Sequence, residues 1–216
     1  MRCLVGVAFV LVASCRVAAQ APSWEFGGIV YGIPATRDAS VSATDVASGS
    51  GTMSGVEIAL RRSWVGLAVR VMNGDLSASS GASGGGGKLT TGELRVQLGP
   101  RIASLDVGYG MRAAGGNLGT TAYSYVRAGG ASIIDIGDTG LSTRVSIGVY
   151  VSGQGVANTT VSGQEIMTAL EYRVRRSPFV ITVGYRAEVF QTTFAGVVRA
   201  EQVSGVMVGA GVRFLR

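Results

Sequence analysis

The chain has 216 residues, enough for one or two domains, and a formal net charge of +6 at pH 7. Only 15% of the residues are charged and the mean hydropathy is +0.36, yet no apolar run in the body of the chain approaches the roughly 18 residues of a membrane helix. These values exclude a bundle of membrane helices. Acidic residues are interspersed among the basic ones, so there is no basic stripe and we expect no nucleic-acid partner.

The chain begins with the features of an export signal. Arg2 precedes an apolar stretch over residues 3–13, and the small residues of SCRVAAQA follow. We predict a signal peptide over 1–19, cleaved after Ala19, and an outer-membrane β-barrel domain over 20–216. The alternative for the apolar stretch is an uncleaved membrane anchor, for which it is short.

Both cysteines, Cys3 and Cys15, lie within this signal. Cleavage after Ala19 would leave a mature chain without a thiol, so we expect neither disulfides nor a cysteine-ligated metal. The sequence VASC resembles a lipobox, and the alternative is that Cys15 becomes a lipidated first residue.

Beyond the signal, two-residue alternation predicts about ten β-strands, and no helical periodicity competes with it. In GELRVQLGPRIASLDVGYGMR, residues 92–112, polar side chains alternate with apolar ones on both sides of a Gly-Pro break. The predicted strands, in chain order, are approximately 23–33, 52–61, 64–73, 88–98, 102–112, 121–133, 141–151, 163–174, 179–190 and 201–214. Residues 113–133 are the least regular, and we expect a bulge or a displaced boundary there.

The predicted strands have two unlike faces, one apolar and one charged. Their length of about ten residues suits a tilted strand that crosses a bilayer. A positive hydropathy that is spread over short alternating segments is typical of a membrane β-barrel. We therefore expect the apolar face to meet lipid and the charged face to point into the barrel.

The predicted connections alternate between short and long. The short ones are 61–63, 99–101, 135–140 and 175–178, and the long ones are 34–51 and 75–87, with shorter examples near 113–120, 152–162 and 191–200. Short periplasmic turns and longer external loops are the asymmetry of an outer-membrane barrel. An even number of strands also returns both termini to the periplasmic side.

Aromatic residues gather near the predicted strand ends, as in two girdles at membrane interfaces. Near the periplasmic ends lie Trp24, Phe26, Trp64, Tyr172, Phe179 and Phe214, and near the outer ends Tyr31, Tyr109, Tyr123, Tyr125, Tyr150 and Phe190. Unbroken alternation would put Tyr31, Trp64, Tyr123, Tyr125, Tyr150 and Phe190 on the charged face. The interface is therefore assigned to Trp24, Phe26, Tyr109, Tyr172, Phe179 and Phe214.

On these features the chain resembles the small outer-membrane β-barrel proteins of Gram-negative bacteria over residues 23–216, including its final strand VSGVMVGAGVRFLR. The resemblance implies an all-β fold, a closed antiparallel transmembrane barrel of about ten strands, with eight or twelve as alternatives. It implies the cell outer membrane as the location, and membrane lipids and the barrel-assembly machinery as partners. The family usually ends in an aromatic residue, whereas Phe214 is followed here by Leu215 and Arg216.

The charged face supplies the candidate site residues. They are Glu57, Arg70, Glu93, Arg95, Asp106, Arg112, Arg127, Arg144, Glu165, Glu171, Arg186 and Glu188, with small residues between them. A barrel of about ten strands is narrow, so we expect these charges to pair and to fill the lumen. The alternative is a narrow, porin-like pore in which some of the arginines conduct anions or small solutes.

Catalytic and metal chemistry find little support in this sequence. The chain has no histidine, and Lys88, the single lysine, lies at a loop edge, so neither a histidine base nor a Ser-Lys pair is indicated. Glu165 and Glu171 could serve as paired carboxylates, but ion-pair partners are abundant. Asp38, Asp45, Asp135 and Asp138 lack calcium-loop spacing, and we expect no enzyme activity, no cofactor and no metal.

The sequence thus predicts a non-enzymatic protein with a structural or surface role in the cell envelope and a surface partner reached through external loops. The narrow pore is one alternative. A secreted soluble barrel that binds an apolar ligand is the other, and it requires the apolar faces to point inward.

Overall fold

The computed structural model describes residues 24–41, 45–79, 86–115, 121–155, 159–194 and 197–215. The signal peptide over 1–19, the cleavage site after Ala19 and the lipidation alternative at Cys15 lie outside these residues. The described residues contain no helix that is long and apolar enough to cross a membrane.

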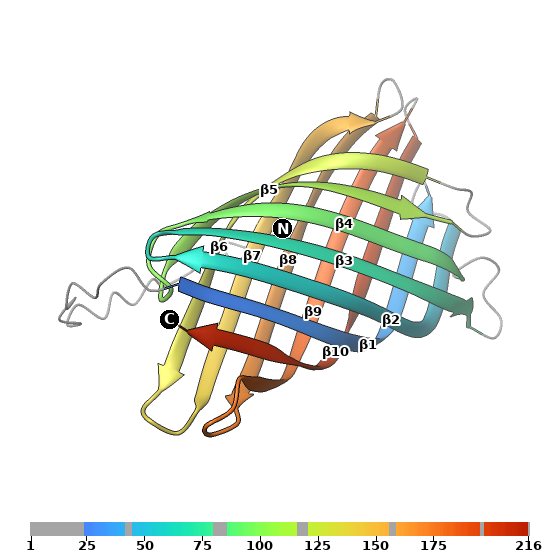
Figure 1. Ribbon diagram of the computed structural model, residues 1–216. Coiled ribbons are helices and arrows are strands. Elements are labelled where there is room, and N and C mark those ends of the chain that lie inside the picture. Colours follow the sequence, from blue (N-terminus) through green and yellow to red (C-terminus); the bar gives the residue numbers. More distant parts are fainter. Residues whose placement is uncertain are drawn as a thin grey trace, which may run out of the picture.

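Ten antiparallel strands close into one barrel, which confirms the predicted fold class and strand number (Figure 1). The strands are β1 (Trp24–Val41), β2 (Asp45–Arg62), β3 (Val65–Ala78), β4 (Gly87–Leu98), β5 (Ser104–Ala114), β6 (Thr121–Ile136), β7 (Leu141–Gly155), β8 (Thr159–Arg173), β9 (Phe179–Phe194) and β10 (Val197–Leu215). Each strand pairs with its neighbours in sequence, and β1 closes the ring against β10. All backbone groups along the strands therefore have a neighbouring strand, and the sheet has no free edge.

The two-residue alternation of the sequence becomes two faces of the barrel wall. On β3, Leu67 and Val69 are 45% and 43% exposed, whereas Ala68 and Arg70 between them are 2% and 1% exposed. The same alternation runs through β5, where Leu105, Val107, Tyr109 and Met111 point outward. A strand must send successive side chains to opposite faces, so the apolar set faces outward and the charged set faces the interior.

One end of the barrel, called the turn end below, carries the four turns 63–64, 99–103, 137–140 and 174–178 (Figure 1). The first described residues of β1 and the last of β10 lie there too, because Glu25 pairs with Leu215. Ser63 and Arg176 adopt positive φ values of 50° and 57° in two of these turns. The predicted short connections thus lie at one end of the barrel.

At the opposite end, called the loop end below, the strands extend further than the sequence predicts. β1 continues to Val41 and β2 starts at Asp45, so most of the long connection expected over 34–51 is paired strand. The connections at this end occupy 42–44, 79–86, 115–120, 156–158 and 195–196, so the predicted asymmetry between short and long connections is wrong. The outward side chains of these extensions, such as Thr36, Asp38 and Thr52, are polar, so the apolar–polar alternation disappears although the strand continues.

Two further expectations concern particular residues. The irregularity expected within 113–133 is a register shift in the β6–β7 pairing between Tyr123 and Tyr125. Tyr31, Tyr123, Tyr125, Tyr150 and Phe190, which unbroken alternation places on the charged face, are buried inside the barrel and form no outer girdle. Of the aromatic residues near the predicted outer ends, Tyr109 points outward.

Candidate functional site

The outward face has an apolar band that begins at the turn end. On β1 it runs from Trp24 to Pro34, on β7 from Leu141 to Val151, and on β9 from Phe179 to Val189. These spans match the 9–11 residues or so with which a tilted strand crosses a hydrocarbon layer. Exposed apolar area of this extent and continuity is rare on soluble monomers.

Aromatic side chains border this band. The six residues assigned to the interface from sequence all face outward, with 40% to 61% of their surface exposed: Trp24, Phe26, Tyr109, Tyr172, Phe179 and Phe214. Trp64, which strict alternation would have turned inward, is 62% exposed because it sits in the turn before β3. Phe26 and Phe214 stack at 6.3 Å where β1 meets β10. Except for Tyr109, these aromatics lie at the turn end.

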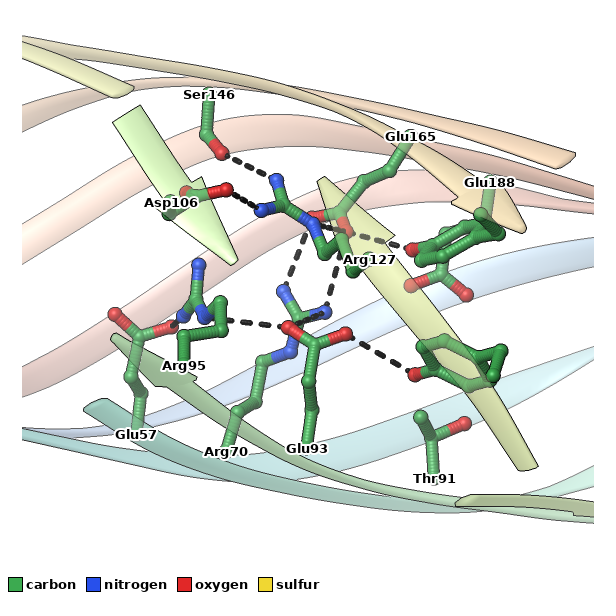
Figure 2. A network of polar contacts seen from close by, with 12 residues as sticks. Glu57, Arg70, Thr91, Glu93, Arg95, Asp106, Arg127, Ser146, Glu165 and Glu188 are labelled. Carbon is green, nitrogen blue, oxygen red and sulfur yellow. Dashed lines mark hydrogen bonds and ion pairs between the residues drawn. The ribbon is translucent and has the colours of Figure 1, made fainter. Parts of the chain in front are cut away.

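The inward face holds the candidate charges, and Glu165 on β8 is at their centre (Figure 2). Arg70 Nη1 and Nη2 donate to its two carboxylate oxygens at 3.0 and 3.2 Å. Arg127 and Arg186 approach it at 3.3 and 3.4 Å, and the Tyr150 hydroxyl donates to it at 2.6 Å. One buried carboxylate thus contacts side chains from four other strands, which satisfies the pairing that burial of a charge demands.

Three ion pairs join strands on opposite sides of the ring. Arg144 on β7 binds Glu57 on β2, and Arg70 on β3 binds Glu165 on β8. Nearer the loop end, Arg112 on β5 approaches Glu201 on β10 at 3.4 Å. Because each pair spans the full width of the barrel, long side chains occupy the interior at three levels.

Other ion pairs lie along the barrel wall. Glu57, Arg70 and Glu93 stand directly opposite one another on β2, β3 and β4 with alternating sign. Arg95 bridges Glu57 at 2.7 Å and Glu93 at 3.2 Å (Figure 2). All twelve charges named from the sequence point inward, and each is within ion-pair distance of an opposite charge.

Arg127 and Arg112 link these charges to other groups. Arg127 contacts Asp106, and its Nη2 donates to Ser146 Oγ at 3.0 Å. Arg112 binds Glu188 at 2.9 Å and lies 4.3 Å from the centre of the Phe190 ring. The ionic and aromatic parts of the interior are therefore in direct contact.

Some charged residues of the interior were missed by sequence reasoning. Arg37 and Glu201 form a buried pair at 2.5 Å between β1 and β10. At the turn end, Arg213 pairs with Glu25 at 3.2 Å and also contacts Glu171. Arg37 falls in a predicted loop, and its outward neighbours Thr36 and Asp38 are polar, so alternation gave no signal for it.

Apolar and aromatic side chains pack among the charges and extend toward the loop end. Tyr125, Tyr150 and Phe190 pack with ring centres 4.3 to 5.5 Å apart, and Tyr125 donates its hydroxyl to Glu93 at 3.1 Å. A second buried cluster comprises Tyr31, Ile33, Ala35, Met53, Met72, Leu76, Leu89, Ala114, Met167, Ala169, Val203 and Met207. A Cβ atom on Gly110 would lie 2.3 Å from the Tyr125 ring, so glycine at this position makes room for the tyrosine.

Little empty volume remains between these layers. A cavity of about 80 Å³ opens near the turn end and is lined by charges that include Glu25, Arg61, Arg144 and Arg213. Two further cavities within the apolar and ionic layers measure about 10 Å³ each, the size that one water molecule needs. Among the described residues, no three His, Cys, Asp or Glu side chains are grouped to hold a metal ion.

No family model and no curated protein matches this chain. Among solved structures, Neisserial surface protein A shares 14% identity at a TM-score of 0.43, over 88% of this chain and 97% of that one. The β-domain of the Bordetella autotransporter BrkA shares 13% at 0.35, over 87% and 98%. A deltaS2 mutant of TodX, a monoaromatic hydrocarbon channel, shares 9% at 0.31, over 89% and 90%.

Proposed function

We propose that this protein is a non-enzymatic β-barrel of the bacterial outer membrane, with an interior filled by paired charges and a structural or surface role in the cell envelope. The observation that carries the proposal is the direction of the two faces. Val69, 43% exposed, points outward, while the neighbouring Arg70, 1% exposed, is held inside by two glutamates. In water this arrangement would expose the apolar face, whereas in lipid it is the favourable one.

The soluble barrel that binds an apolar ligand requires the opposite orientation. Its Leu, Val and Ile side chains would line the interior, and Arg and Glu would face solvent. The exposed positions of Leu105 and Ile147 and the buried positions of Arg95 and Glu93 contradict that alternative.

A closed interior, rather than a pore, is supported by the side chains that cross it. The pairs Arg144–Glu57, Arg70–Glu165 and Arg112–Glu201 span opposite strands, and buried apolar and aromatic side chains pack among them. An open pore needs a continuous polar path, and the cavities of about 10 Å³ do not form one. The engagement of the buried carboxylates by arginines supports a role without acid–base catalysis.

The strand extensions at the loop end support a role at the cell surface. Beyond the apolar band, Asp38, Ser50 and Asp75 face outward from paired strands, so the wall continues into a polar environment. We propose that the turn end faces the periplasm and that these hairpins rise above the outer leaflet, where a surface partner would contact them. The barrel-assembly machinery would recognise β10, the strand that closes the ring by pairing with β1, where Phe214 lies opposite Phe26.

The first test is an unboiled and a boiled sample of the purified envelope protein on a denaturing gel. We expect faster migration before boiling, because a closed barrel with a paired interior resists the detergent. A soluble product that shows no mobility shift and needs no detergent would overturn the membrane barrel.

The second test is a planar-bilayer recording of the same preparation, with a porin inserted in parallel to establish that single channels are detected. We expect no discrete conductance steps, because side chains span the lumen at three levels. Steps from the refolded barrel would overturn the closed interior and favour the narrow pore.

A further inference from the structure

The turn end carries a hollow of about 1020 Å³ between the β6–β7 turn, the β8–β9 turn and the end of β10. Figure 1 shows these two turns projecting at the end of the barrel where the C-terminus lies. The hollow is lined by five arginines and two aspartates, together with Leu141, Phe214 and Leu215. Its walls are therefore both strongly basic and partly apolar.

Two of the five arginines are already neutralised by acidic partners. Arg101 binds Asp135 at 2.6 Å, and Arg213 binds Glu25 at 3.2 Å. The other three, Arg173, Arg175 and Arg176, are exposed, and no carboxylate of the described residues lies within ion-pair distance of them. Asp138, on the facing turn, is the acid that lines the hollow without an ion pair among those residues.

The β8–β9 turn that presents these arginines is fixed by hydrogen bonds. Ser177 N donates to Val174 O at 3.2 Å, and Phe179 N donates to Ser177 Oγ at 3.2 Å. Arg213 N donates to Pro178 O at 2.7 Å, which ties the turn to the end of β10. A ligand would therefore meet a preorganised backbone, and only side chains would need to be ordered.

The β2–β3 turn offers a natural comparison, because both turns contain the tripeptide Arg-Arg-Ser, at 61–63 and 175–177. In the β2–β3 turn the guanidinium groups are occupied. Arg61 donates to the carbonyl oxygens of Ser63 and Gly99, and Arg62 lies 5.1 Å from the centre of the Trp24 ring. The same residues in the β8–β9 turn face an open hollow instead.

The apolar lining of the hollow joins it to the outward band. Leu141 and Phe214 line the hollow and are also 37% and 49% exposed on the outer face of the barrel. Tyr172, which pairs with Leu141, and Phe179 extend this apolar surface. A ligand with an anionic head and an apolar tail would satisfy both parts at once.

We propose that this hollow binds a phospholipid with an anionic headgroup, drawn from the leaflet around the turn end. Its phosphate would accept hydrogen bonds from Arg173, Arg175 and Arg176, and its acyl chains would lie on Leu141, Phe179 and Phe214. Arginine is suited to this role because its planar fork binds phosphate oxygens in pairs. The inference rests on the proposed position of the barrel in a membrane.

The test compares two double variants, Arg175→Gln/Arg176→Gln and the matched control Arg61→Gln/Arg62→Gln. Each refolded protein, in a neutral detergent, is titrated with phosphatidylglycerol or phosphatidylcholine, and retained lipids are counted by native mass spectrometry. We expect the wild type and the control to prefer phosphatidylglycerol, and the β8–β9 variant to lose about tenfold or more of that preference. Rising salt should weaken the preference of the wild type.

Equal losses in the two double variants, or none in either, would overturn the site. Tight binding of inorganic phosphate without a preference among lipids would overturn the lipid as its source. The gel mobility shift on boiling shows whether each protein forms the barrel, so it separates a failure of the lipid site from a failure of the proposed function. Variants that shift but lose no lipid preference overturn the site alone, whereas proteins that never insert overturn both.

Discussion

The barrel wall has two sections that share one hydrogen-bonded ladder but differ in what lies outside it. From the turn end to about Pro34 and Val71 the outward side chains are apolar. Beyond that level the outward residues are polar, as at Thr36 and Asn73, while the inward side chains stay buried on both sides of the boundary. The difference teaches that backbone pairing makes the wall, whereas the outward alternation records which part of it meets lipid.

The largest effect on stability is expected inside the section that carries the apolar band, at Glu165. Glu165→Ala would leave Arg70, Arg127 and Arg186 without the carboxylate they share, and we expect a loss of about 3–5 kcal/mol in the free energy of unfolding. Denaturant titration of the protein folded in vesicles measures this loss. The control is Asp75→Ala. Asp75 is exposed on the polar section near the loop end, so this change should leave stability nearly unchanged. Similar midpoints for the two variants would show that the ionic interior does not hold the barrel together.

The boundary between the sections can be tested on one strand and one face. Val69→Arg should cost about 2–4 kcal/mol of unfolding free energy, because it puts a charge into the apolar band. Asn73→Arg, four positions further along β3 and also facing outward, should cost about 1 kcal/mol or less, because it lies in the polar extension. The same vesicle titration compares them, and equal costs would contradict the boundary drawn here.

The smallest effect on stability is expected where a glycine is replaced, and it depends on the space for a side chain on the inner or the outer face. Gly110→Val would drive a side chain into the Tyr125 ring, and we expect a cost of about 1–3 kcal/mol. Gly92 on β4 faces outward with no atom within 4 Å of an added Cβ, so Gly92→Val should be nearly neutral. Thermal loss of the fast-migrating gel band measures both. A Gly92→Val variant that is the less stable one would mean that the faces are reversed.

Sequence reasoning predicted the candidate site better than the length of the wall. The twelve inward charges could be named because each alternates with residues of the apolar band, as Arg144 does with Val145. Arg37 was missed, because its outward neighbours Thr36 and Asp38 are as polar as the inward arginine. Where no lipid selects for apolar residues, a strand and a polar loop have similar compositions.

The aromatic residues illustrate the same limit. Trp24 and Phe214 follow the alternation and face outward at the turn end. Tyr125 and Phe190 lie near strand ends, where a girdle would be, yet they pack inside with Tyr150. Their position near the strand ends suggested a membrane interface, but the alternation of side chains along the strand turned them inward.

The sequence by itself determined the class of the fold, the approximate number of strands and the face on which the twelve named charges lie, because side-chain direction follows from local alternation. Only the tertiary structure decided which charges meet. Arg70 and Glu165 are 95 residues apart and come together because ring closure puts β3 opposite β8. Likewise, two identical Arg-Arg-Ser turns differ because one packs on Trp24 and Gly99 while the other borders an open hollow. Such contacts depend on strand order and register around the closed ring, which no local pattern specifies.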